Sequence, residues 1–279
     1  MVRQADLSHP NPKELGVHSQ FPYVYPVVEA KSPGSPFVRY PLIPSVALLA
    51  MSPFSAAFAQ RPCPGLKEPR IIHQNGRTAL EFQTRMEVDV DGAPNAYGPK
   101  GKKTLDILAH AYAPRVPGKP RELVGYMTDD DAGRKPTIQG KGDPYPGFYV
   151  SQTDFADIHN PRMEDPRRYV NAATTNYVVL GRAAINAGVQ LGDFVTAYSC
   201  RTGKSAYAIV GDSGNESGAE GSLALVRNLG YEHITNGIDE SVDDPEIVIR
   251  YFPHTNPDHQ FFKTQPELDE AAKKLDLTK

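Results

Sequence analysis

Apolar and polar positions alternate along much of the chain after residue 68, in short runs rich in Val, Ile, Tyr and Phe. Gly, Asp or Pro bounds several of these runs, as is typical of strands with one buried face. The predicted strands are 71–73, 79–89, 147–151, 177–180, 193–198, 205–210 and 246–252. The pattern therefore predicts a single β-rich domain.

Helical patterns are few and short. We expect helices over 104–111, over 222–229 with Gly230 ending the helix, and over 266–275 with Thr264 as its N-cap. The third belongs to a charged C-terminal tail, 263–279, which we expect to be a peripheral appendage of the main domain, 60–262.

A proline-rich leader, 1–59, precedes this domain and has no sustained periodicity over its first 41 residues. Its last part is apolar and ends in Ala57-Phe58-Ala59, which resembles a secretory signal and its cleavage site. Translation from Val38 would give a signal peptide over 38–59 and a secreted, extracellular or periplasmic, protein. The alternative is a structural segment packed on the domain. Pro44 and Pro53 argue against a membrane span.

Composition describes an ordinary globular chain of 279 residues, with 26 Pro and 23 Gly favouring a loop-rich β architecture. The net charge is −3 and basic residues form no patch, so we expect no nucleic-acid partner. The eight histidines have no metal-ligand spacing, and the chain lacks a nucleophile elbow, a P-loop and a dinucleotide fingerprint. We expect a monomer.

Two cysteines, Cys63 and Cys200, match neither a zinc site nor a Cys-x-x-Cys redox motif. In an exported protein they would form one disulfide, and in the cytosol they would be buried thiols. The signal-like segment favours the disulfide.

A pair of carboxylates lies in the glycine-rich stretch 206–225. An apolar strand leads into Asp212, and Glu220 follows eight residues later at the start of a short helix. Hydrolysis of a glycosidic bond needs one protonated carboxyl to assist the leaving oxygen and one ionised carboxylate to activate water. The alternative is a polar loop whose acids are solvated.

A second acidic pattern occurs in 86–97, where Glu87, Asp89 and Asp91 would share one face of a strand. A calcium-binding loop that starts at Glu87 is excluded, because its twelfth position is Gly98, where such a loop needs a bidentate Glu. Such a face meets either solvent or a cationic ligand, for example a glycan rich in ammonium groups.

Several segments in order resemble the glycoside hydrolase family 75 chitosanases, and the resemblance covers about residues 70–255. The segments that carry it are 79–82, 86–97, 105–108, 146–154, 176–181, 191–193 and 206–230. The family implies endo-hydrolysis of the β-1,4 bonds of chitosan with inversion at the anomeric carbon, and no metal or cofactor. One departure is Ala219, where the family pattern has Gly.

The resemblance implies that Asp212 and Glu220 are the catalytic pair. We expect Asp89 and Asp91 to contact the ammonium groups of glucosamine, and the rings of Tyr97 and Tyr149 to stack on sugars.

The strand–Asp-x-Gly–helix arrangement is also similar to double-psi β-barrel proteins that cleave cell-wall glycans, in which a lone Asp is the acid. This likeness predicts a compact six-stranded, double-psi-like β-barrel with a few short helices. It also provides two alternatives for function: a lytic enzyme that cleaves peptidoglycan, and a relative that binds glycan without cleaving it.

Overall fold

The computed structural model describes residues 62–113, 115, 117–130 and 134–279. The leader 1–59, with the signal-like segment 38–59, lies outside these ranges. Within them, no helix combines the length and the apolar character needed to cross a membrane.

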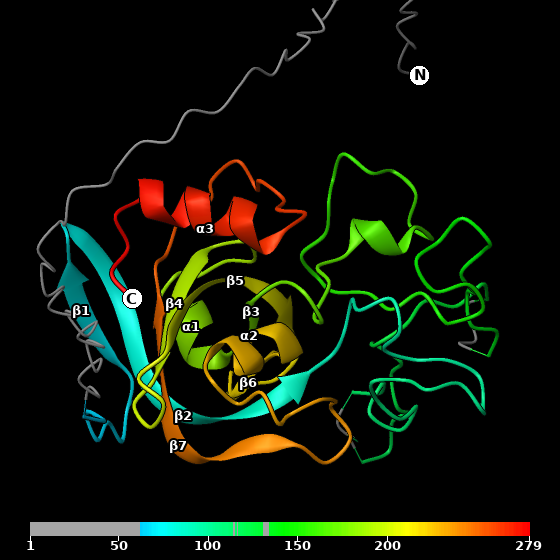
Figure 1. Cartoon of the computed structure of the whole chain (residues 1–279), viewed down its shortest axis with the longest axis horizontal. Helices are drawn as coiled ribbons and strands as arrows, with labels where there is room; N and C mark the ends of the chain where they lie inside the picture. Colours follow the sequence, from blue (N-terminus) through cyan, green and yellow to red (C-terminus); the bar gives the residue numbers. More distant parts are fainter. Residues whose placement is uncertain (1–61, 114, 116, 131–133) are drawn as a thin grey trace, which may run out of the picture. The chain divides into compact units, whose positions relative to one another are not determined.

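A closed β-barrel forms the centre of the described domain, as predicted (Figure 1). Its six strands follow one another around the barrel in the order β2-β6-β3-β5-β4-β7, and β7 pairs with β2 to close it; β1 adds an outer strand to β2. The pairs β2–β6 and β3–β5 are parallel and the others antiparallel. The strands are β1 (Arg70–Gln74), β2 (Arg77–Asp89), β3 (Tyr177–Leu180), β4 (Phe194–Ser199), β5 (Ser205–Ser213), β6 (Glu220–Ser222) and β7 (Ser241–Tyr251).

The barrel interior is filled by β-branched and aromatic side chains. Ile209, Ile249 and Tyr251 are fully buried, and so is Tyr177 at the start of β3. Each buried aliphatic side chain of this size contributes roughly 1.5–3 kcal/mol. β4 is buried along its whole length and β5 at all but its two end residues, so both faces of these strands are covered.

Three short α-helices accompany the strands in the described part: α1 (Arg182–Asn186), α2 (Leu223–Asn228) and α3 (Gln265–Lys274). The predictions for α2 and α3 are confirmed. The Ser222 hydroxyl caps α2, Gly230 beyond its end has φ +101°, and Thr264 caps α3. The helix α3 is not a peripheral appendage, however, because Leu268 on its inner face is fully buried.

Two predicted elements are wrong. Residues 104–111 form turns: the Leu105 carbonyl, which a helix would pair with the N–H of residue 109, accepts the N–H of Gly237 instead, and the His110 N–H donates to the Ile107 carbonyl. Residues 147–151 form isolated bridges, not a strand. Both belong to the long connection between β2 and β3, whose described parts contain one short 3-10 helix, η1 (Pro166–Arg168).

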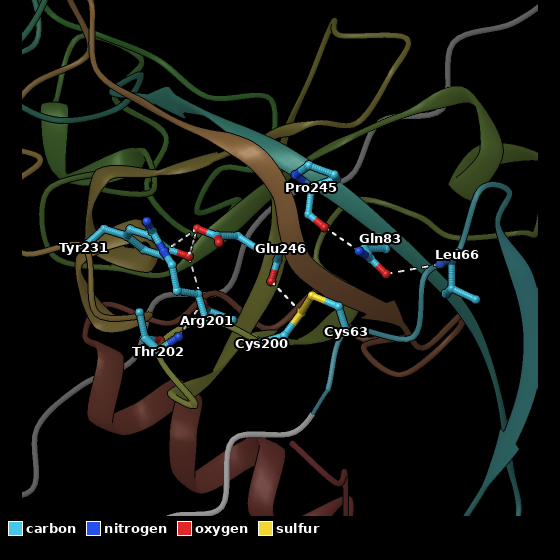
Figure 2. The surroundings of a disulfide bond; sticks show 10 residues. Cys63, Leu66, Gln83, Cys200, Arg201, Thr202, Tyr231, Pro245 and Glu246 are labelled. Atoms are coloured by element: carbon cyan, nitrogen blue, oxygen red, sulfur yellow. Dashed lines mark hydrogen bonds and ion pairs between the residues drawn. A yellow bond between two sulfur atoms is a disulfide. The ribbon is translucent and has the colours of Figure 1, made fainter.

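The disulfide between Cys63 and Cys200 is present, as expected for the exported form (Figure 2). It links the segment before β1 to the turn after β4, and the Gln83 side chain accepts a hydrogen bond from the Leu66 N–H nearby (3.1 Å). The bond closes a loop across a sequence separation of 137 residues.

Replacing both cysteines by serine should lower the free energy of unfolding by about 2–4 kcal/mol, because the unfolded chain regains the entropy of an open loop. Urea denaturation of the double variant beside the wild type measures this. Equal stability of the two proteins would contradict a stabilising role, and the wild type under reductant should behave like the variant.

Candidate active site

A β-bulge places Asp212 near the end of β5. In the parallel pair β3–β5 the register shifts between Val178 and Val179, so that Val179 lies opposite Asp212. Gly211 precedes it because a Cβ there would lie 2.5 Å from the Cβ of Tyr177. Bulges commonly redirect side chains beside functional sites, and here one determines where the first predicted carboxylate lies.

Asp212 is buried, with 7% of its surface exposed. One oxygen, Oδ1, accepts the N–H of Ser213 (2.8 Å) and the N–H of Asp154 (3.1 Å). The carboxyl group is therefore held in one orientation by the backbone on both sides.

Glu220 is the first residue of β6, a three-residue strand that the sequence analysis did not predict. In the parallel pair with β2 it lies opposite Glu87, and Val88 and Asp89 lie opposite the next two residues of β6. Side chains alternate between faces along a strand, so Glu87, Asp89 and Glu220 share one face.

The glycine expected at 219 is not needed there. Gly218 takes the positive φ of this turn (+65°) and packs against Gly181, where a Cβ would lie 2.6 Å from the Gly218 Cα. Ala219 is buried, and its carbonyl accepts the Glu87 N–H at 2.8 Å. Ala219 itself does not have a positive φ, so its methyl group causes no backbone strain before Glu220.

Asp89 and Asp91 join the same site. Asp89 ends β2, and its Oδ1 accepts the Asp91 N–H at 2.8 Å. The Tyr97 hydroxyl donates to Asp91 Oδ1 (2.7 Å) and the Tyr177 hydroxyl to the Asp91 carbonyl (3.0 Å). Carboxylate oxygens of Asp89, Asp91 and Asp212 all lie within 4.8 Å of one another. The structure thus brings together the two acidic patterns of the sequence.

Crowding and burial make these groups hard to ionise. Burial, followed by the charges of Asp89 and Asp91, raises the pKa of Asp212 well above its usual value. Burial and the charge of Asp89 raise the pKa of Asp91 in the same way. Burial raises the pKa of Asp89 to about 6.

Glu220 responds to a partly different set of neighbours. Burial, the charge of Asp89 and the neighbouring Glu87 raise its pKa to about 7, while a hydrogen bond from Asn215 opposes the shift. The charge of Asp89 therefore raises the pKa of both Asp212 and Glu220. Burial and neighbouring charges thus raise the pKa of both members of the predicted pair, through partly different sets of neighbours.

Three carboxylate oxygens this close could also hold a divalent cation. One oxygen each of Asp89, Asp91 and Asp212 is already hydrogen-bonded within the protein, and we assign no metal to the cluster.

The prediction that Tyr97 stacks on a sugar is wrong, whereas that for Tyr149 stays a prediction. Tyr97 is only 2% exposed, and its hydroxyl holds Asp91, so its ring is not available to stack on a sugar. Tyr149 is partly buried and packs on Tyr126, with ring centroids 5.1 Å apart. The exposed ring of the same segment is Tyr145, at 42%.

Two further carboxylates were missed, although both lie in segments that carry the resemblance. Asp154 donates its N–H to Asp212, and Asp106, which is 5% exposed, pairs with His110 at 2.8 Å. Residue type alone gave no signal for them, because only the folded loops bring them to the site.

Clefts do not identify the site. One cleft of about 610 Å³ borders α3, and another of about 660 Å³ is lined by Tyr145, Pro166 and residues around them. The carboxylates Asp89, Asp91, Asp212 and Glu220 line neither. The candidate site therefore rests on the carboxylates and their surroundings.

The variant Asp89→Asn should be more stable than the wild type above pH 6 by about 1–2 kcal/mol, with no difference near pH 4. The raised pKa of Asp89, about 6, makes the folded wild type bind more protons than the unfolded chain between pH 4 and 6. Its stability therefore falls across that window, whereas Asn carries no charge and keeps an acceptor for the Asp91 N–H. Urea denaturation at pH 4 and pH 7 tests this.

The matched control is Glu216→Gln, an exposed carboxylate paired with Arg182 at 2.7 Å, which should show no such pH-dependent gain. A variant Asp89→Asn that is no more stable than the wild type at pH 7 would contradict the electrostatic cost assigned to this cluster.

Compared with protein-family models and with curated proteins, the chain gives no match. The resemblance to the chitosanases therefore stays a prediction that rests on the residues.

Proposed function

We propose that this protein hydrolyses the β-1,4-glycosidic bonds of chitosan, within the chain and with inversion. The observation that carries the proposal is the pair Asp212 and Glu220, which lie in one acidic site with separate environments. Inversion needs the two carboxyl groups roughly 6.5–9.5 Å apart, with water between the base and the anomeric carbon.

The raised pKa values support the roles. Burial and the charges of Asp89 and Asp91 raise the pKa of Asp212 well above its usual value, which favours the protonated form that can donate a proton to the leaving oxygen. The pKa of Glu220 is about 7, so a large part of this group is ionised near neutral pH and can take a proton from the attacking water. Asp212 is the general acid and Glu220 the general base.

The charge of the site favours a cationic polysaccharide. The hydrogen bonds described for Asp89, Asp91 and Asp212 come from backbone N–H groups and a tyrosine hydroxyl, and none of the described ion pairs joins these three acids to Lys or Arg. Asp89, with a pKa of about 6, is ionised at neutral pH, and a carboxylate without such partners attracts cations, including the ammonium groups of glucosamine. Asp89 and Asp91 would contact these groups.

The disulfide supports a secreted protein, since such bonds persist in oxidising compartments. A polysaccharide substrate would be met there. The proposed enzyme acts as a monomer, and its chemistry requires carboxyl groups alone.

Asp212→Asn and Glu220→Gln should each lower release of reducing ends from chitosan oligosaccharides by at least about 100-fold, because each removes one proton-transfer group. Both variants should keep the wild-type fold by circular dichroism. Glu216→Gln, in the loop between the two acids, should keep near-normal activity.

Parallel assays on purified peptidoglycan distinguish the alternatives. Peptidoglycan solubilised by the wild type, with no release from chitosan, would replace the chitosanase proposal by a lytic one with Asp212 as the lone acid. Binding of chitosan without cleavage would indicate a non-catalytic glycan-binding protein.

The rate on short chitosan oligomers should follow a bell-shaped pH profile. The acidic limb should rise through pH about 7 as Glu220 ionises, and the alkaline limb should fall at higher pH as Asp212 loses its proton. A profile measured as kcat/KM from pH 4 to pH 10 shows both limbs. An optimum below pH 5 would contradict this assignment of acid and base.

A further inference from the structure

The loop 151–155 crosses the end of β5 and is fixed by buried hydrogen bonds. The Ser151 hydroxyl donates to the Gly125 carbonyl (2.7 Å), and the Thr153 hydroxyl donates to the Phe155 carbonyl (2.8 Å). The Phe155 N–H donates to the carbonyl of Gly211 at 3.1 Å. The loop is therefore anchored directly beside Asp212.

Asp154 is the exposed residue of this loop, between the buried Thr153 and Phe155. Its N–H donates to Asp212 Oδ1, while its own carboxylate accepts the Ser213 hydroxyl. None of the ion pairs described includes it. The side chain is thus a solvent-facing carboxylate held at a fixed place next to the acid.

Asp89 and Asp91 are less exposed to solvent than Asp154. Their carboxylate oxygens face each other and Asp212, and hydrogen bonds within the protein occupy one oxygen of each. A cation arriving from solvent therefore meets the carboxylate of Asp154 with less rearrangement than it would need to reach the cluster.

We propose that Asp154 is a specificity-determining residue that binds the ammonium group of the glucosamine unit beside the bond to be cleaved. This rests on the proposed function and names the group that selects its substrate. An ammonium group forms a charge-assisted hydrogen bond with a carboxylate, whereas an N-acetyl group carries no charge and has only an amide N–H to donate. The residue therefore selects deacetylated units next to Asp212.

The test compares Asp154→Asn with the wild type on glucosamine oligomers and on oligomers of matched length with N-acetylglucosamine units, each protein at its own pH optimum. We expect kcat/KM on glucosamine oligomers to fall roughly tenfold, mostly through KM, with less than a twofold change on the acetylated ones. Glu216→Gln should change neither.

Two results would overturn the proposal: an equal loss on both substrates, which indicates that Asp154 only positions Asp212, or no loss on either. Binding measured by titration calorimetry distinguishes failure of the role proposed for Asp154 from failure of the proposed hydrolysis. If the wild type cleaves no glycan but prefers glucosamine oligomers in binding, and Asp154→Asn removes that preference, the site assignment stands. Binding without any preference in the wild type would refute it.

Discussion

Mutual repulsion among crowded carboxylates is the constraint on which the rest of this structure depends. Asp89, Asp91 and Asp212 present oxygens within 4.8 Å of one another; Asp212 is buried and the other two are partly buried. Isolated loops would relieve such a cluster by separating the charges. Here the cluster is retained because its members lie at the ends of β2 and β5, whose positions the closed barrel fixes.

The barrel provides this rigidity through one long strand. β2 pairs with β7 and β6 and carries the outer strand β1, so that it closes the barrel and delivers Asp89 to the site. The disulfide links the chain before β1 to the turn after β4 and stabilises this arrangement of strands against unfolding (Figure 2). The free energy that the barrel and the disulfide contribute to folding thus offsets the electrostatic cost of the clustered carboxylates.

The sequence predicts several elements well because strand and helix-cap patterns are local: the limits of 177–180 agree with β3, and both capped helices, α2 and α3, are where expected. The barrel itself is predicted only by the likeness to double-psi β-barrel proteins. It misplaces 104–111, because the Leu105 carbonyl accepts a long-range hydrogen bond from the Gly237 N–H instead of continuing a helix. Similarly, the two acidic patterns are visible in the sequence, but their convergence depends on a β-bulge at Val178 and Val179. The role of Tyr97 is wrong for a related reason, because only the fold buries its ring.

The stereochemistry of the first product tests the central claim most directly. Proton NMR can follow the anomeric signals while wild-type protein cleaves a glucosamine oligomer, before mutarotation mixes the anomers. Inversion by Asp212 and Glu220 predicts that the α-anomer forms first from the β-linked substrate. Initial formation of the β-anomer, or of an anhydro sugar, would contradict an inverting pair and require a different role for Glu220.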